Sequence, residues 1–322
     1  MKIEVRLIVG IVAASLAGAA LAQANYPTRP VRIIVPSSPG GGTDILSRLV
    51  APGFSERLGQ TAVVDNRPGA GSIIGNDIVA KSPPDGYTLL MGISTLAILP
   101  SMHKKLPYDA MRDLAPITQV IAAPNILVVH PSLPVKSVKD LIAFAKKHPG
   151  ELNYGSAGLG TNPHLSMELF LSMTGIKMVH IAYKGLGPAL VDLVAGHVVA
   201  ATSTMLAGLP HVKAGRLRAL ATTGAKRSAV LPDLPTVAEA GVPGYEAVQW
   251  YGLFAPGKTP QPIITKLHDA MVGALKSPAI GDKLKIDGAE AVGSTPEEFG
   301  RFLRSETQKW GKVVRAAGIQ PR

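Results

Sequence analysis

Short apolar runs alternate along the chain with longer segments in which apolar residues recur every three or four positions. Val31–Val35 is typical of a buried strand, and residues 44–58 after it are typical of a helix. The same pattern predicts further extended segments at 62–65, 88–91, 114–122, 126–129, 153–154, 179–182, 198–201, 217–222 and 245–255. It predicts further helices at 72–81, 138–147, 161–174, 262–276 and 296–317, and between the strands at 179–182, 198–201 and 217–222. Such alternation favours an α/β fold with a mainly parallel sheet covered by helices on both faces.

The C-terminal part of the chain contains too few strands to form a sheet of its own. After the extended segment at 245–255 the pattern shows two helices and only one weak strand, at 289–292. We therefore expect this part to return to the first lobe. Lobe 1 would comprise 25–123 plus 249–322 and lobe 2 would comprise 124–248, with a two-strand hinge near Ala122–Ala123 and Gln249. Residues 231–244, rich in Pro and Gly, are expected to form a loop around a short helix.

The N-terminus has the features of a secretory signal peptide. Lys2 and Arg6 precede an alanine-rich apolar run, which ends in two small-residue sites, Ala20-Leu-Ala22 and Ala22-Gln-Ala24. This pattern predicts that residues 1–24 are removed during export to the periplasm. The chain has no cysteine, so a lipid anchor, a disulfide and a thiolate metal site are excluded.

Charge narrows the class of ligand. The chain has 33 Lys and Arg against 22 Asp and Glu, a formal net charge of +11, and a field of this sign favours the capture of anions. The basic residues are scattered and only 5% of residues are aromatic, which argues against nucleic-acid binding.

Two glycine-rich turns connect a strand to a helix. The first, Pro39-Gly-Gly-Gly-Thr-Asp44, follows the strand at 31–35, and the second spans residues 155–161. Glycines let backbone N–H groups approach a ligand, and a helix N-terminus adds partial positive charge. If these turns face each other from opposite lobes, they can hold a small anion with dipoles and hydroxyls.

A third glycine turn, Arg67–Gly75, is close to a dinucleotide-binding motif but has one residue too many between its glycines. We expect it to support the first turn or to supply further N–H groups. The sequence shows no nucleophile elbow, acid–base pair or zinc-type histidine spacing, so we predict no enzymatic activity, no cofactor and no metal. His164 could reach a ligand, although capping is the simpler role. Lys184 either pairs with the ligand or is a solvated lysine.

Many collinear motifs give the chain a family resemblance. They are Tyr26-Pro-Thr-Arg-Pro-Val-Arg32, Pro39–Asp44, Asn66-Arg-Pro-Gly-Ala-Gly71, Pro84-Asp-Gly-Tyr-Thr-Leu89, Lys105-Leu-Pro-Tyr-Asp109, Ser156-Ala-Gly158, Val179-His-Ile-Ala-Tyr-Lys-Gly185, Leu234-Pro-Thr-Val-Ala-Glu-Ala-Gly241 and Trp310-Gly-Lys-Val-Val-Arg-Ala-Ala-Gly318. With these the chain resembles the substrate-binding receptors of tripartite tricarboxylate transporters, known as TctC or Bug proteins, over nearly its whole length.

The resemblance implies a type II periplasmic-binding-protein fold, with two doubly wound lobes joined by a two-strand hinge in the manner of a Venus flytrap. It implies a monomeric receptor that binds a small organic carboxylate and delivers it to the membrane subunits of a transporter. An alternative is a periplasmic ligand-sensing protein of the same fold that acts with a signalling partner.

The chain departs from the family pattern at three places near the expected site. Ser37-Ser38 replaces an aromatic residue and its neighbour, Val199–Thr204 replaces an acidic and amide-containing stretch, and Leu159 replaces an asparagine. These departures leave the identity of the carboxylate open. The expected ligand-binding residues are Ser37, Ser38, Gly41, Gly42, Thr43, Asp44, Ser94, Thr95, Ser156, Ala157, Gly158, Thr161, Ser203 and Thr204.

Overall fold

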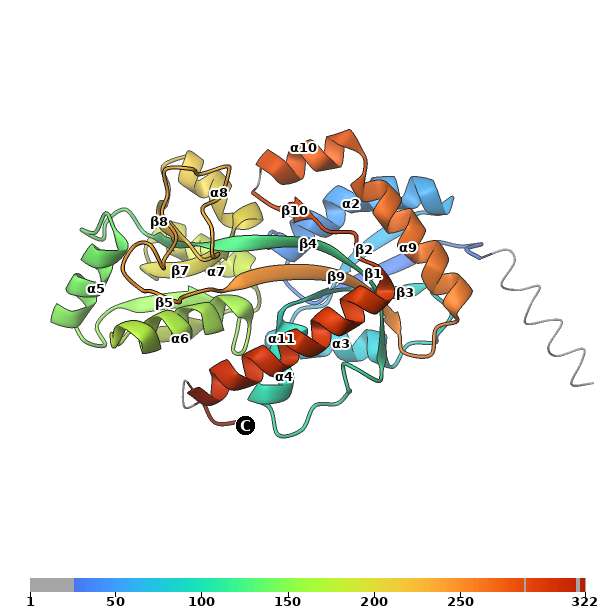
Figure 1. Cartoon of the computed structure of the whole chain (residues 1–322), viewed down its shortest axis with the longest axis horizontal. Helices are drawn as coiled ribbons and strands as arrows, with labels where there is room; N and C mark the ends of the chain where they lie inside the picture. Colours follow the sequence, from blue (N-terminus) through green and yellow to red (C-terminus); the bar gives the residue numbers. More distant parts are fainter. Residues whose placement is uncertain (1–25, 287, 317–318, 322) are drawn as a thin grey trace, which may run out of the picture.

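The computed structural model describes residues 26–286, 288–316 and 319–321, so the predicted signal peptide lies outside the described residues (Figure 1). The described strands form one sheet in the order β2-β1-β3-β9-β4-β7-β5-β6, with β8 and β10 each paired to β4. The strands are β1 (Val31–Val35), β2 (Ala62–Asn66), β3 (Thr88–Ile93), β4 (Leu114–Val129), β5 (Asn153–Ser156), β6 (Val179–Ala182), β7 (Ala200–Thr204), β8 (Arg218–Thr222), β9 (Val248–Pro256) and β10 (Glu290–Ala291).

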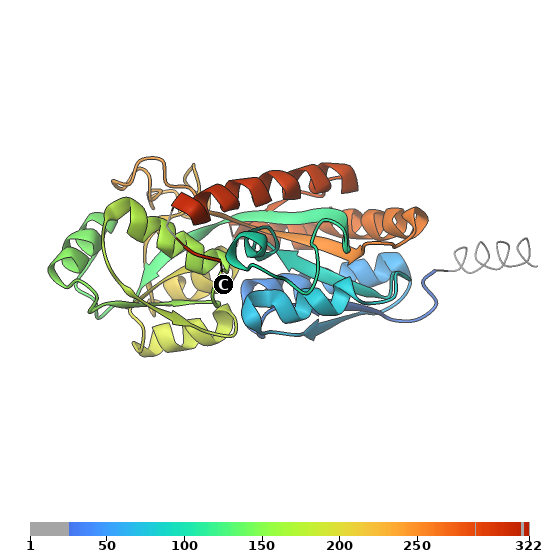
Figure 2. The same cartoon turned by 90° about the horizontal axis from the view of Figure 1, so that it is seen from below.

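In one half of the sheet, β2, β1 and β3 are parallel, and β9 runs antiparallel to β3. Helices pack on both faces of this half (Figures 1 and 2). One face is covered by α2 (Gly42–Leu58), α9 (Gln261–Leu275) and α10 (Pro278–Ile286), and the other by α3 (Ile73–Ala80), α4 (Thr95–Met102) and α11 (Pro296–Ala316). In particular, α11 packs along α4 and β4.

The other half of the sheet contains β4, β5, β6, β7 and β8, and it too is covered on both faces. Along β4, Ile126 and Val128 pack against one pair of helices, while Leu127 and Val129 pack against the other pair. This alternation follows from the period of two in a strand. The first pair is α7 (Leu186–Ala195) and α8 (Met205–Lys213), and the second is α5 (Val138–Lys147) and α6 (Asn162–Thr174).

The two halves are connected by long strands. The extended segments predicted at 114–122 and 126–129 are in fact one strand, β4, of 16 residues. Ala123-Pro124-Asn125 suggested an interruption, but the backbone stays extended there. At this point β4 leaves its partner β9 and pairs with β7 and β8. Proline is tolerated in a strand where ladder pairing changes. The lobe boundaries at 123/124 and 248/249 stay predictions.

Two helices in the structure were not predicted, and one expected helix is absent. The two unpredicted helices are α4, which contains Pro100, and α10. Residues 231–244 contain turns and no helix, so that expectation was wrong. Within the described part of the chain, no helix combines the length and apolar character needed to cross a membrane.

Candidate functional site

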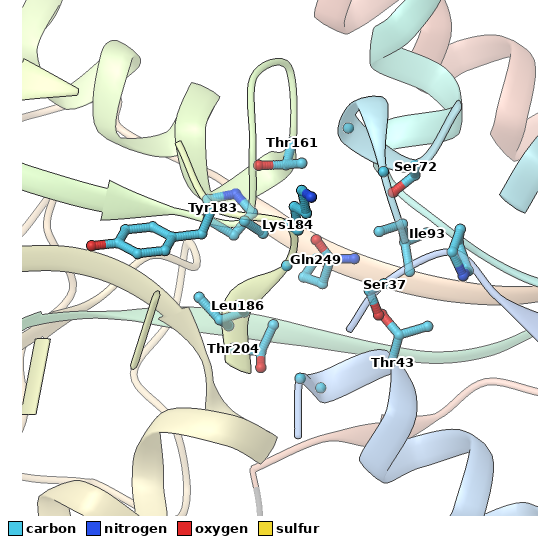
Figure 3. Close-up of a pocket in the computed structure, with 18 of the residues that line it drawn as sticks. Ser37, Thr43, Ser72, Ile93, Thr161, Tyr183, Lys184, Leu186, Thr204 and Gln249 are labelled. Carbon is cyan, nitrogen blue, oxygen red and sulfur yellow. The ribbon is translucent and has the colours of Figure 1, made fainter. Parts of the chain in front are cut away.

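Five helices begin at one cavity of about 70 Å³ between the two halves of the sheet (Figure 3). A water molecule needs about 10–15 Å³ of such space, so the cavity suits a small molecule. The helices are α2, α3, α6, α7 and α8, and the residues at their starts that line the cavity are Gly41, Gly42, Thr43, Ser72, Thr161, Gly185, Leu186 and Thr204. Each N-terminus carries a partial positive charge of roughly half an elementary charge, so their convergence favours an anion.

One end of the cavity, called here the α2 end, consists of Gly41, Gly42, Thr43, Thr204 and Tyr251. A methyl group added at Gly42 would lie 2.5 Å from both Thr204 Oγ1 and the Tyr251 hydroxyl, so any other residue there would displace these side chains. Thr43 is 5% exposed, and its hydroxyl has no hydrogen-bond partner among the described residues. Burial raises the pKa of Tyr251, which keeps its hydroxyl protonated. The α2 end therefore offers an uncommitted hydroxyl beside the start of a 17-residue helix.

The opposite end, called the α3 end, consists of Gly69–Ser72 together with Ala157 and Thr161. Figure 3 shows Ser72 and Thr161 at one end of the cavity and Thr43 and Thr204 at the other. Four successive residues have positive φ: 130° at Gly69, 48° at Ala70, 61° at Gly71 and 84° at Ser72. This conformation costs a residue other than glycine about 1–2 kcal/mol. Such strain is commonly found at functional sites.

The turn at 183–187 lies between these two ends. Ser38 Oγ donates a hydrogen bond to the carbonyl of Lys184, and a methyl group added at Gly187 would lie 2.4 Å from the carbonyl oxygen of Pro39. The side chain of Lys184 is exposed and forms no ion pair with a residue that the structure describes. The turn therefore closes against the first glycine turn through backbone contacts and places one cationic residue at the cavity.

Half of the sequence-predicted site residues line the cavity. These are Ser37, Gly41, Gly42, Thr43, Ala157, Thr161 and Thr204. The other predicted residues are not part of the lining, namely Ser38, Asp44, Ser94, Thr95, Ser156, Gly158 and Ser203. The two predicted glycine turns both line the cavity, but each has a different nearest neighbour across it. The first turn meets Thr204 at Gly42. The second turn meets the third glycine turn, because Gly71 lies against the carbonyl of Leu159.

Two predicted residues outside the lining stabilise the turns that form it. Asp44 accepts hydrogen bonds from the Gly40 N–H at 3.0 Å and from Arg48 Nε at 2.9 Å. Ser156 Oγ lies 2.6 Å from His180 Nε2 and accepts from the N–H of Gly158 at 3.1 Å. Both polar side chains are committed to their own turns, so they shape the site and leave no free donor for a ligand.

His164 also stabilises a turn. Its Nδ1 accepts the Gly160 N–H at 3.1 Å, and its ring stacks on that of His180 with 4.1 Å between centroids. It does not line the cavity, whereas Lys184 does. Capping, the simpler of the two roles considered for His164, describes its place in the structure.

Sequence reasoning missed part of the lining. These residues are Pro36, Gly69, Ala70, Gly71, Ser72, Ile93, Pro163, Tyr183, Gly185, Leu186, Gln249 and Tyr251. One signal was present, because the third glycine turn and the turn after β6 both follow the carboxyl end of a parallel strand, where α/β proteins place ligands. Tyr183 donates to Asp192 at 2.6 Å; burial and this bond raise the pKa of Tyr183 to about 12.

Comparison with known proteins agrees with this geometry. Residues 46–319 match the family described as tripartite tricarboxylate transporter family receptor. Protein BugT of Bordetella pertussis is 42% identical over 97% of this chain and 97% of its own length. An R. palustris protein solved with adipate is 42% identical, with a TM-score of 0.90 over 92% of this chain and 100% of the other.

A second solved structure, MatC from Rhodopseudomonas palustris with bound malate, is 30% identical. Its TM-score is 0.87 over 90% of this chain and 100% of MatC. These similarities confirm the predicted α/β fold of the periplasmic-binding type. They also confirm the family that the sequence motifs indicated. The chain belongs to the receptor family of tripartite tricarboxylate transporters.

Proposed function

We propose that the chain is an extracytoplasmic solute-binding receptor that captures a small organic carboxylate in the cavity and delivers it to the membrane subunits of a tripartite tricarboxylate-type transporter. The observation that carries this proposal is the convergence of five helix N-termini on one small cavity. Backbone N–H groups and aligned dipoles at such termini attract anions.

The side chains around the cavity support a carboxylate in particular. Thr43 and Ser72 supply hydroxyls that make no hydrogen bond with a described residue, Lys184 is the one basic residue in the lining, and the lining contains no acidic residue. The adipate and malate bound by two similar proteins are carboxylates as well. A lining of this kind receives one or two negative charges without a buried counter-charge.

Capture in this proposal is a closing of lobe 1 (25–123 plus 249–322) on lobe 2 (124–248). The hinge consists of β4 and β9, the long strands that pair near Ala123 and Gln249. Contacts across the cleft support this motion, because the turn at 185–187 meets Ser38 and Pro39 at distances only glycine allows. The ligand is enclosed when these turns meet.

Export is part of the same proposal, with residues 1–24 acting as a cleaved signal peptide and a periplasmic monomer as the mature form. Intact-mass measurement of the periplasmic protein should give a chain that begins at Gln23 or Asn25. Retention of the first 22 residues in that fraction contradicts the proposal.

The test of the binding function is a thermal-shift screen with mono-, di- and tricarboxylates, amino acids and neutral sugars. A ligand at 100 times its Kd stabilises the folded state by about 2.7 kcal/mol and raises the melting temperature by several degrees. We expect such a rise with at least one carboxylate and none with sugars, followed by calorimetry on the best ligand. A rise with uncharged ligands alone overturns the proposal.

A further inference from the structure

A histidine outside the cavity holds the second glycine turn in place. The N–H of Gly160 donates a hydrogen bond to Nδ1 of His164 at 3.1 Å, which ties the turn to the first residues of α6. The next residue, Thr161, is 2% exposed and lines the cavity (Figure 3). The position of the α6 N-terminus at the cavity therefore depends on this bond.

The direction of the bond determines the protonation state of His164. A backbone N–H can only donate, so Nδ1 has to accept and carries no proton. The neutral ring meets this condition in the tautomer that has its proton on Nε2. The protonated ring carries a hydrogen on both nitrogens and would turn a second donor toward the N–H of Gly160. Protonation of His164 therefore removes its bond to the turn.

A carboxylate lies near the other nitrogen of the ring. Glu168 Oε1 is 3.8 Å from Nε2 of His164, one turn further along α6, and it accepts a hydrogen bond from the Tyr154 hydroxyl. Burial and this bond raise the pKa of Tyr154, so the phenol stays neutral. A protonated His164 would form an ion pair with Glu168 as it loses Gly160, which offsets part of the lost bond.

A second histidine faces His164 from β6. The rings of His180 and His164 stack with 4.1 Å between centroids, and His180 Nε2 lies 2.6 Å from Ser156 Oγ. A hydroxyl both donates and accepts, so this bond persists whether His180 is neutral or protonated. Two stacked imidazolium rings repel each other, so the pair takes up one proton more readily than two. Of the two histidines, His164 is the one whose protonation breaks a bond to the turn.

Three further elements contact the same region through uncharged groups. Thr202 of β7 donates to the carbonyl of Pro163 at 2.8 Å. Met102 of α4 lies 3.4 Å from the position of a methyl group added at Gly160, and Gly71 of the third glycine turn lies against Leu159. The charge of the region therefore changes chiefly with the two histidines and Glu168.

We propose that His164 is a positioning residue, whose neutral imidazole holds the second glycine turn at the cavity and whose protonation lowers the affinity of the receptor for its ligand. The inference rests on the proposed function and adds to it a release of the carboxylate on acidification. An unperturbed histidine titrates near pH 6.5. The affinity is therefore highest above about pH 7 and falls as the pH decreases toward about 5.

The first part of the test needs no ligand and no variant. NMR follows the ring of His164 and the backbone amide of Gly160 in the isotope-labelled mature protein, from about pH 8 to about pH 5. We expect both signals to change in one transition with a common midpoint. A Gly160 amide that stays unchanged while His164 titrates overturns the inference, and so does a His164 that does not titrate in this range.

The second part measures affinity by calorimetry with the best carboxylate of the thermal-shift screen, at about pH 8 and about pH 5.5. His164→Asn keeps an acceptor oxygen near the place of Nδ1 and does not titrate, whereas His164→Ala has no acceptor. His148→Asn is the matched control, since His148 is an exposed histidine at the end of α5 that pairs with Glu151.

We expect the wild type and His148→Asn to bind about tenfold more weakly at the lower pH. His164→Asn should change much less between the two conditions, and His164→Ala should be weak in both. Protonation of the ligand itself affects all four proteins alike, so the comparison between wild type and His164→Asn isolates His164.

The same pH dependence in the wild type and in His164→Asn overturns the role of His164 and leaves a carboxylate receptor in place. Equal affinity of the wild type in both conditions overturns it as well. Absence of binding by every acid is different, because it overturns the proposed function, while the NMR titration still decides whether the bond between His164 and Gly160 responds to pH.

Discussion

The two ends of the cavity close in different ways. At the α2 end, Gly42 meets two side chains, Thr204 and Tyr251. At the α3 end, Gly71 meets the backbone, and a methyl group there would lie 2.5 Å from the carbonyl oxygen of Leu159. A side chain can turn aside by rotation about its own bonds, but a backbone carbonyl moves only if its whole turn moves. The α3 end, together with the backbone contact between Gly187 and Pro39, therefore determines how closely the two lobes of the proposed receptor approach.

The substitution Gly71→Ala should have the largest effect. The added methyl group overlaps the Leu159 carbonyl, so the cleft stays partly open and the hydrogen bonds to the ligand lengthen at both ends. We expect the affinity for the best carboxylate to fall about 100-fold, which corresponds to about 2.7 kcal/mol. Calorimetry measures this loss.

Gly40→Ala is the matched control for Gly71→Ala. Gly40 also has positive φ, at 79°, and nothing lies within 4 Å of an added methyl group. It therefore repeats the backbone strain, about 1–2 kcal/mol in unfolding free energy, without the overlap. Equal losses of affinity in the two variants would show that strain, and not contact with Leu159, is responsible.

The next largest effect concerns two hydroxyls that the sequence alone could not distinguish. Thr43→Ala removes a hydroxyl without a partner and should weaken binding about tenfold, the effect of about 1.5 kcal/mol. Ser156→Ala removes one that is bound to His180 and Gly158. It should lower the free energy of unfolding by about 1 kcal/mol and change affinity much less.

Calorimetry and chemical denaturation of both variants separate these effects. If Ser156→Ala loses as much affinity as Thr43→Ala while remaining folded, the ligand contacts the turn at 156–161 through Ser156.

The sequence predicted the turns of the site better than the directions of their side chains. Gly41–Thr43 could be identified because three glycines between a strand and a helix have no structural advantage. Ser156 belongs to the correct turn, but its side chain points to His180 and away from the cavity. The direction of a side chain at the end of a strand depends on strand register, and a shift of one residue reverses it.

A local sequence pattern could not predict the contacts across the cleft, because they join segments that are far apart in the sequence. The third glycine turn was expected to support the first turn or to supply further N–H groups, but its contact with Leu159, some 90 residues away in the sequence, could not be predicted. Gln249 and Tyr251 line the cavity from β9 because that strand returns to pair with β3 and β4. The fold was easier to predict, since alternating strands and helices follow from hydrophobic periodicity alone.

The smallest effect should come from Tyr183, which serves both ends of the cavity. Its hydroxyl donates to Asp192 at 2.6 Å and fixes the turn that carries Lys184 and Gly185. Tyr183→Phe should therefore weaken binding of the best carboxylate by less than about threefold at pH 7. A loss of tenfold or more would show that Tyr183 does more than fix this turn.

The pH dependence of stability provides a second measure of the same bond. Burial and the bond to Asp192 raise the pKa of Tyr183 from 10.0 to about 12, so folding favours the neutral hydroxyl. Its contribution to stability is complete below pH 10 and is lost as the pH rises to about 12.

The wild type should exceed Tyr183→Phe in free energy of unfolding by a constant amount between pH 7 and 9. The difference should shrink above pH 10, because the phenol ionises more readily in the unfolded chain. Urea denaturation across this range measures it, with Asp192→Asn as a second variant that keeps the phenol and removes its charged partner. A difference that stays constant up to pH 12 would mean that the hydroxyl contributes no stability through its bond to Asp192, and that the turn is held by its backbone contacts with Ser38 and Pro39.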